Sequence, residues 1–304
     1  GIPVCEALGG ASRDKVRVYN TCSGYSFNAK SSSYDTASTR RTIKKGEKPA
    51  GPYDDQVAFM PDAGKLAKNL LSEGYTAMKI WPFDMWATGS YGCDITDEGI
   101  ERGMDAFRKI RDAVGGKMQI MCEMHSIWKL PAALKICRAL EEVGVFWAED
   151  CLCKMDDKQA LRELRSKTST PICGSETLSG MTSFREMISE GAFDYVMLDT
   201  GWCGGLSEGR KIAALADSFC KPFAPHDCTG PVQLWAGLHL AAHASNALFQ
   251  EVVRANLASW YKDLVTELPQ ISDGYAAVPA APGIGTELRP EVYTRPDAVV
   301  RVSE

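Results

Sequence analysis

The sequence of 304 residues contains no apolar run near the ~20 residues that a membrane-spanning helix needs. It also lacks an excess of basic charge, since 34 Lys and Arg against 39 Asp and Glu give a net charge of −5. A surplus of acid disfavours binding to a phosphate backbone, so we expect neither a membrane nor a nucleic acid as a partner. With 45% hydrophobic and 24% charged residues, the composition is that of a globular protein.

The cysteines lack the pattern of a disulfide framework or of a zinc site. There are eleven, an odd number, and several lie in apolar stretches such as Met121-Cys122. Cys151 and Cys153 are separated by one residue rather than two, and no second pair follows at ligand spacing. No basic segment followed by an apolar run opens the sequence. We therefore expect buried free thiols in a reducing, cytoplasmic setting.

The dominant pattern is a short apolar run followed by a segment with helical spacing. Eight such runs occur, and seven of them precede a helical segment. This alternation predicts parallel strands joined by helices, in the α/β class. The inventory is that of a TIM-type (β/α)7β barrel whose final helix is weak or replaced. The expected strands are residues 16–19, 76–81, 119–123, 145–149, 171–174, 195–199, 222–224 and 248–252. The expected helices are residues 61–73, one beginning near 96, 131–143, 157–167, 182–191, 206–220 and 230–244.

A doubly wound open sheet is the structural alternative, but eight regular units favour closure. No GxGxxG follows the first expected strand, which removes the signature of dinucleotide binding. The polar residues 31–41 show no clear periodicity and are expected to form a long loop. We divide the chain into the end of a helix (1–14), a barrel domain (15–255) and a C-terminal segment (256–304).

Reactive side chains stand at the ends of the expected strands. In a barrel of this type, catalytic residues lie at the carboxyl ends of the strands. After the first interval, successive members are about one strand-and-helix unit apart, so they should point at one central site. They are Lys79, Glu123, Glu149, Glu176, Asp199, His226 and Glu251.

Three consecutive strands are expected to end in carboxylates, Glu123, Glu149 and Glu176. Such a set of hard oxygen ligands suits Mg²⁺, whereas thiolates or imidazoles would indicate zinc or iron. An acid at a strand end can simply cap the following helix. Three of them in register, however, would bury like charges together without a cation. The sequence therefore predicts one Mg²⁺ per site.

This constellation resembles the enolase superfamily, in particular its mandelate racemase group. The resemblance implies that Glu123, Glu149 and Glu176 are metal ligands and that Asp199 and His226 form a catalytic pair. The segment GYAAVPAAPGIGTEL is also similar to the family's closing segment. Family members carry an N-terminal α+β capping domain, so the resemblance implies that residues 1–14 end a helix of a missing capping domain, to which the C-terminal tail would return. It also implies an even-numbered homo-oligomer.

Two departures from the family pattern stand out. Many relatives have Lys-x-Lys at the end of the second strand, where this chain has Lys79-Ile80-Trp81. The loss of the second lysine argues against carrying over the racemase mechanism. The first metal ligand is often Asp in relatives, and here it is Glu123.

The resemblance implies abstraction of a proton α to a carboxylate, with a divalent cation stabilising the enediolate. His226 is the expected base, and Asp199 would fix its tautomer and raise the pKa of the imidazole. Lys79 could be a base on the opposite face or a cation that holds the substrate carboxylate. Glu251 is expected to hydrogen-bond that carboxylate, unless it is a surface acid.

His125 is the residue that discriminates among the possible reactions. It follows Glu123 by two positions and should point to the same side of an extended chain, into the site. Glu123-Met124-His125 resembles the Asp/Glu-x-His motif of sugar-acid dehydratases, such as galactonate and mannonate dehydratases. In those enzymes the histidine is the general acid that protonates the departing β-hydroxyl, which a racemase does not need. A fourth metal ligand or a loop histidine is the alternative.

Aromatic residues after the strand ends could wall a sugar pocket, and we assign Trp81 and Trp202 to substrate binding, although core packing is about as common. His239 and His243 are four apart on a helix that should pack outside the barrel, so we expect a structural role for both.

Our first hypothesis is a Mg²⁺-dependent hydro-lyase that converts an aldonate or aldarate to its 2-keto-3-deoxy acid. A racemase, epimerase or cycloisomerase would use Lys79 and His226 on opposite faces of the substrate. The third hypothesis is a binding-only or inactive fragment without its lid.

Overall fold

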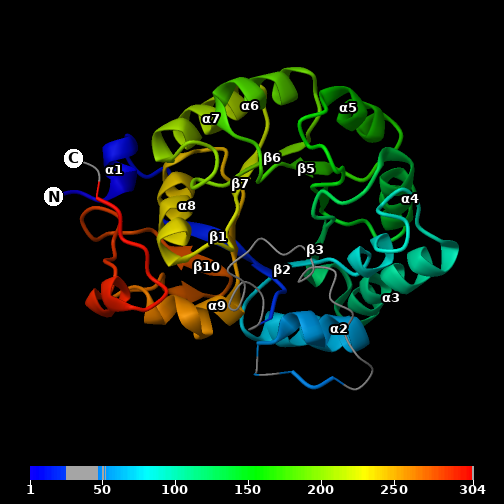
Figure 1. Ribbon diagram of the computed structural model, residues 1–304, viewed down its shortest axis with the longest axis horizontal. Coiled ribbons are helices and arrows are strands. Elements are labelled where there is room, and N and C mark those ends of the chain that lie inside the picture. The colour runs from blue at the N-terminus through cyan, green and yellow to red at the C-terminus, as the bar shows by residue number, and fades with distance from the viewer. Residues whose placement is uncertain (25–46, 50, 52, 303–304) are drawn as a thin grey trace.

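Eight short parallel strands form the centre of the molecule, and helices surround them (Figure 1). The computed structural model describes residues 1–24, 47–49, 51 and 53–302, so the loop predicted at residues 31–41 lies outside the described residues. Each strand from β1 to β6 pairs with the next one along the chain. The strands are β1 (Lys15–Thr21), β2 (Ala77–Ile80), β3 (Gln119–Glu123), β4 (Trp147–Glu149), β5 (Ile172–Gly174), β6 (Tyr195–Leu198), β7 (Phe223–Pro225) and β8 (Gln250–Val252).

The sheet closes between its first and last strands. β8 pairs in parallel with β1, and Tyr19 lies opposite Glu251 in this register. A parallel bridge between Phe223 and Ala247 joins β7 to the residues before β8, and the N–H of Leu248 donates to the carbonyl of Phe223 at 2.8 Å. The predicted TIM-type barrel is therefore confirmed, and these pairings do not fit an open doubly wound sheet.

A helix follows each of the first seven strands, as predicted. The helix predicted at residues 61–73 begins earlier, at Asp55, and contains a non-helical residue, Asp62 (φ −151°). Pro61 has no N–H and its ring crowds the preceding turn, so the helix breaks near this proline instead of starting there. The helices are α2 (Asp55–Ser72), α3 (Asp97–Val114), α4 (Leu130–Leu140), α5 (Lys158–Ser166), α6 (Gly180–Ser189), α7 (Leu206–Ser218), α8 (Pro231–His243) and, after β8, the short α9 (Arg254–Ala258).

The barrel interior holds an apolar layer of side chains with a charged layer next to it. Because side chains alternate along a strand, the residue two positions after an inward-facing apolar residue also faces inward. Lys79 thus follows Ala77, and Glu123 follows Met121. The apolar layer consists of Tyr19, Ala77, Met121, Trp147, Cys173, Met197, Ala224 and Phe249.

The N-terminal and C-terminal segments pack together against α8, and both lie on one side of the barrel in Figure 1. His239 accepts a hydrogen bond from the N–H of Cys5 at 3.0 Å, and its Nε2 lies 3.0 Å from the carbonyl of Ile284. His243 pairs with the carbonyl of Gly10 at 2.9 Å. Both histidines therefore fasten the segments to α8, in agreement with the structural role predicted for them. The assignment of residues 1–14 to a capping domain stays a prediction.

The eleven cysteines are free thiols, and seven of them are buried. In the described part of the chain, no helix combines the length and apolarity required to cross a bilayer.

The contact between α2 and α3 depends on Gly64. A Cβ at this position would lie 2.7 Å from the carbonyl oxygen of Lys109 and 2.9 Å from the Cβ of Ala113. Replacing a helical glycine by alanine normally stabilises by up to about 1 kcal/mol. Here we expect Gly64→Ala to lower the free energy of unfolding by about 1–3 kcal/mol, because the backbone of α3 must move. Urea denaturation measures the difference.

Gly116→Ala is the matched control, because a Cβ at Gly116 meets nothing within 4 Å. If Gly64→Ala proves as stable as the wild type or more stable, the close approach of α2 and α3 is wrong.

Candidate metal and acid–base site

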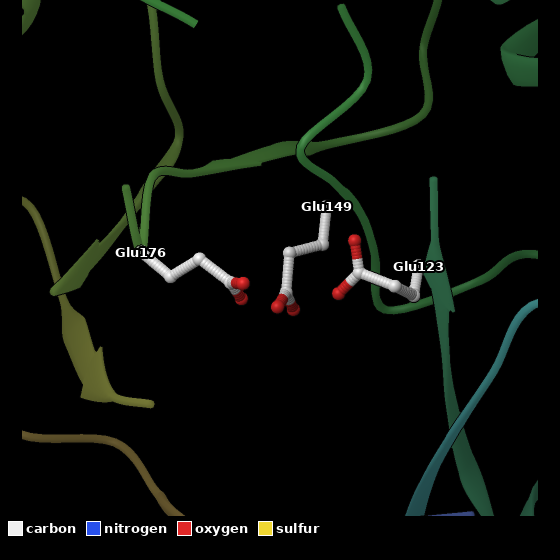
Figure 2. Close-up of side chains that lie close together, drawn as sticks. All are labelled: Glu123, Glu149 and Glu176. Carbon is white, nitrogen blue, oxygen red and sulfur yellow. The ribbon is translucent and has the colours of Figure 1, made fainter. Parts of the chain in front are cut away.

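Three glutamates from neighbouring strands face one another at the charged layer of the barrel (Figure 2). Glu123 and Glu149 end β3 and β4 and are paired in register, and Glu176 follows β5. One oxygen from each of the three lies within 4.8 Å of the others. Glu123 and Glu149 are buried, whereas the side chain of Glu176 is 17% exposed. The structure thus brings the three predicted metal ligands together.

Glu123 is held by the turn that follows it. Its Oε1 accepts hydrogen bonds from the backbone N–H groups of Met124 at 3.0 Å and His125 at 2.7 Å. Burial by itself would raise the pKa of Glu123. Lys79, the His125 ring and the His125 backbone N–H outweigh burial and hold that pKa below its usual range. Glu123 is therefore fixed in place as an anion.

Lys79 lies within the carboxylate cluster. Its Nζ is 3.0 Å from Glu123 Oε2 and 3.0 Å from Glu251 Oε1, and it also contacts Glu149. The side chain is 2% exposed. Burial opposes the charge, but these carboxylates raise the pKa of Lys79 well above its usual range. Either predicted role, base or substrate cation, would require the ammonium group to leave at least one of these partners.

Glu251 is a buried member of the cluster, which rules out the surface-acid alternative. Besides Lys79, its Oε1 accepts a hydrogen bond from the hydroxyl of Thr21 on β1. Its Oε2 accepts from the backbone N–H of Asp227 at 3.2 Å. Burial by itself would raise the pKa of Glu251, but Lys79, His226 and the Thr21 hydroxyl outweigh burial and lower it.

The donor set fits a hard divalent cation. Four carboxylates converge here, Glu123, Glu149, Glu176 and Glu251, and among the described residues a single ammonium group contacts three of them. Burial and the negative charge of Glu123 raise the pKa of Glu149 well above its usual range. Oxygen ligands and uncompensated buried anions are the conditions under which proteins bind Mg²⁺.

His226, which follows β7, pairs with Asp199, which follows β6. The Nδ1 of His226 lies 2.8 Å from Asp199 Oδ2, and its Nε2 lies 3.2 Å from Glu176 Oε2. The second oxygen of Asp199 accepts from the N–H of Gly201 at 2.7 Å. Burial by itself lowers the pKa of His226, but the nearby carboxylates, Glu176 foremost, raise it well above its usual range. The predicted pair thus has the geometry of an oriented base.

His125 forms a second histidine–carboxylate pair with Asp84. Its Nδ1 lies 2.6 Å from Asp84 Oδ2, and the Asp84 side chain is completely buried in the short 3-10 helix η1 (Asp84–Ala87). Burial opposes protonation, but Asp84 and Glu123 raise the pKa of His125 to about 9. Asp84 was not predicted, because it lies in an irregular segment four residues after β2, where strand periodicity gives no signal.

Strand alternation does not orient His125, contrary to the prediction. β3 ends at Glu123, and His125 and Ser126 have left-handed backbone conformations, with φ of 47° and 54°. The chain therefore turns after Glu123 instead of continuing as an extended strand. The contact with Asp84, rather than strand alternation, determines the orientation of the ring.

Each of the two site histidines, His125 and His226, has an indole ring beside it. The ring centroid of Trp202 lies 5.4 Å from that of His226, and Trp81 contacts His125 edge to face at 5.3 Å. Trp81 is only 3% exposed and also packs against Phe59, so it presents little surface to a ligand. Substrate binding by Trp81 and Trp202 stays a prediction, as do the catalytic roles of the other site residues.

A family model described as enolase C-terminal domain-like matches residues 62–292. Curated relatives include a D-gluconate dehydratase of Thermoproteus tenax, 28% identical over 295 residues that cover 97% of this chain and 52% of the relative. A D-xylonate dehydratase of Haloferax volcanii is 26% identical over 292 residues, which cover 94% of this chain and 63% of the relative. The chain thus spans about half the length of the first curated relatives it matches.

Solved structures show the same similarity. An enolase protein from environmental sequencing of the Sargasso Sea is 49% identical with a TM-score of 0.83, over 99% of this chain and 71% of that one. An enolase of the mandelate racemase subgroup from Agrobacterium tumefaciens is 41% identical with a TM-score of 0.79, over 96% of this chain and 68% of that one.

The buried position of Lys79 makes it a test of the charge balance. We expect Lys79→Met to lower the free energy of unfolding by about 3–5 kcal/mol in the presence of a chelator, because it leaves buried carboxylates without their cation. Chemical denaturation of both proteins measures this difference.

Lys135→Met is the control, since Lys135 pairs with Asp94 at 2.6 Å on the surface, where both side chains are at least half exposed. Lys135→Met should lower the free energy of unfolding by no more than about 1 kcal/mol. Equal stabilities of the two variants would show that Lys79 does not neutralise the cluster.

Proposed function

The chain belongs to the enolase C-terminal domain-like family, and we propose that its barrel carries the chemistry of a Mg²⁺-dependent sugar-acid dehydratase. The observation that carries this proposal is the second histidine–carboxylate pair, His125–Asp84. His125 follows β3 and His226 follows β7, four strands apart in a ring of eight, so the two pairs stand on opposite sides of the carboxylate cluster.

Dehydration of a sugar acid requires two proton transfers. A base removes the proton α to the carboxylate, and an acid protonates the β-hydroxyl as it departs. In the proposed reaction the Nε2 of His226 takes the α-proton, while Asp199 holds Nδ1 and fixes the tautomer. His125 gives a proton from Nε2 to the departing hydroxyl, while Asp84 holds its Nδ1. Water leaves, and the resulting enol tautomerises to a 2-keto-3-deoxy acid.

The residues that would hold the cation are Glu123, Glu149 and Glu176. A bound Mg²⁺ would supply positive charge to offset the negative charge that develops on the substrate carboxylate. Lys79, itself paired with Glu251, would keep the ligands Glu123 and Glu149 in position.

The relatives support the substrate class. Several relatives are named as dehydratases of gluconate, arabinonate, galactonate or xylonate, which are all aldonates. We propose an aldonate or a closely related sugar acid as the substrate. The racemase hypothesis gains no support, because it needs Lys79 as a free base, and this ammonium group contacts three carboxylates.

His125→Asn separates the two proton transfers. We expect it to lower the rate of dehydration by about 10²–10⁴, because the departing hydroxyl loses its proton donor. Exchange of the α-proton with deuterated water should continue, because His226 is intact. NMR of an aldonate panel with Mg²⁺ in D₂O measures both rates.

His226→Asn is the control and should lose exchange and dehydration together. If His125→Asn dehydrates at the wild-type rate, His125 is not the acid. Binding of an aldonate by the wild type without exchange or turnover would favour the binding-only hypothesis instead.

Asp84→Asn tests the orientation of His125 without removing the imidazole. We expect dehydration to slow at least about tenfold, since a neutral amide no longer stabilises the protonated imidazole of His125 that donates to the hydroxyl. The loss should fall on kcat, with α-proton exchange unchanged. Asp94→Asn, at an exposed carboxylate paired with Lys135, is the control and should leave both rates unaltered. Loss of exchange together with dehydration in Asp84→Asn would contradict this role.

A further inference from the structure

Trp147 donates a hydrogen bond to one of the three convergent glutamates. Its indole Nε1 lies 2.8 Å from Glu149 Oε2, and both side chains are completely buried. The two residues are two positions apart on β4, so both point into the barrel. Trp147 belongs to the apolar layer, and its N–H reaches the charged layer above it.

The direction of this N–H is fixed by the rings around it. The centroid of Trp147 lies 5.7 Å from that of Tyr19, 5.3 Å from that of Tyr195 and 6.0 Å from that of Phe249. Edge-to-face and tilted contacts with these rings support the indole on several sides. The packing of the barrel interior therefore favours the orientation that makes the hydrogen bond.

The bond restrains the Glu149 carboxylate. With Oε2 held by the indole, Oε1 is directed to Lys79 and the centre of the cluster. The neighbouring glutamates have other supports, because backbone N–H groups hold Glu123 and His226 contacts Glu176. In Figure 2, Glu149 lies between these two side chains. An error in its orientation would disturb both neighbours.

We propose that Trp147 is a positioning residue of the metal site, whose indole N–H fixes the Glu149 carboxylate in the orientation that binds a hard divalent cation. The inference rests on the metal site of the proposed function. Partners of ligating carboxylates commonly change metal affinity by 10–100-fold when they are removed.

The test compares two tryptophan-to-phenylalanine variants. Trp147→Phe keeps an aromatic ring and removes the N–H. Trp128→Phe is the matched control, because Trp128 is also completely buried and its N–H has no hydrogen-bond partner within the described ranges. Electron paramagnetic resonance of free Mn²⁺ gives the affinity of each protein for Mn²⁺. Competition between Mn²⁺ and Mg²⁺ then gives the affinity for Mg²⁺. Denaturation in a chelator gives the stability of each variant.

We expect Trp147→Phe to bind Mn²⁺ about tenfold more weakly than the wild type, and Trp128→Phe to bind it equally well. Wild-type affinity in a folded Trp147→Phe variant would overturn the inference and leave the metal site intact. Failure of the wild type itself to bind Mn²⁺ would overturn the metal site, and with it this inference.

A second measurement needs no variant of Trp147. In the ¹H–¹⁵N spectrum of the wild type, we expect the indole N–H of Trp147 to show the largest shift among the seven tryptophans when Mg²⁺ is added. An unchanged Trp147 signal at saturating Mg²⁺ would overturn the inference even if Trp147→Phe does not fold.

Discussion

The constraint that shapes this molecule is the burial of several carboxylates at one end of the barrel interior. Glu123, Glu149 and Glu251 lie on three different strands and share the ammonium group of Lys79. One cation does not balance this group, and Glu176 adds further negative charge beside it. Like charges held this close in a low-dielectric interior are tolerated only when they are paired, protonated or bound to a cation. The backbone donors, the lysine and the proposed Mg²⁺ are therefore parts of one charge balance.

Each histidine of the site is oriented by a carboxylate from another element, and Glu149 is held by the indole of a residue on its own strand. Asp199 holds His226, Asp84 holds His125, and Trp147 holds Glu149. The barrel makes this possible because its strands deliver the groups in register while the apolar layer of aromatic rings supports them from within. Precise orientation of acids, bases and ligands lowers the cost of reorganisation when a substrate binds.

The sequence predicted those features that depend on periodicity along the chain. Strand and helix alternation gave the barrel, and the strand ends predicted the groups that the structure brings together, from Lys79 to Glu251. Contacts that depend on irregular backbone were missed. Asp84 lies in a 3-10 helix, where no repeat of two or of 3.6 residues locates it. Strand alternation predicts His125 in the site, but His125 lies in a left-handed turn and is oriented by its contact with Asp84 instead. The position of Pro61 predicts a helix start there, but α2 begins before it, at Asp55. Trp147 was overlooked because an indole within an apolar run gives no sign that its N–H will meet a carboxylate.

The most direct test of the account is anomalous diffraction from crystals of the protein grown with Mn²⁺ in place of Mg²⁺. We expect one strong anomalous peak between the carboxylates of Glu123, Glu149 and Glu176, within bonding distance of an oxygen from each. A fully occupied Mn²⁺ elsewhere, or no peak at saturating Mn²⁺ while the three carboxylates stay together, would contradict it.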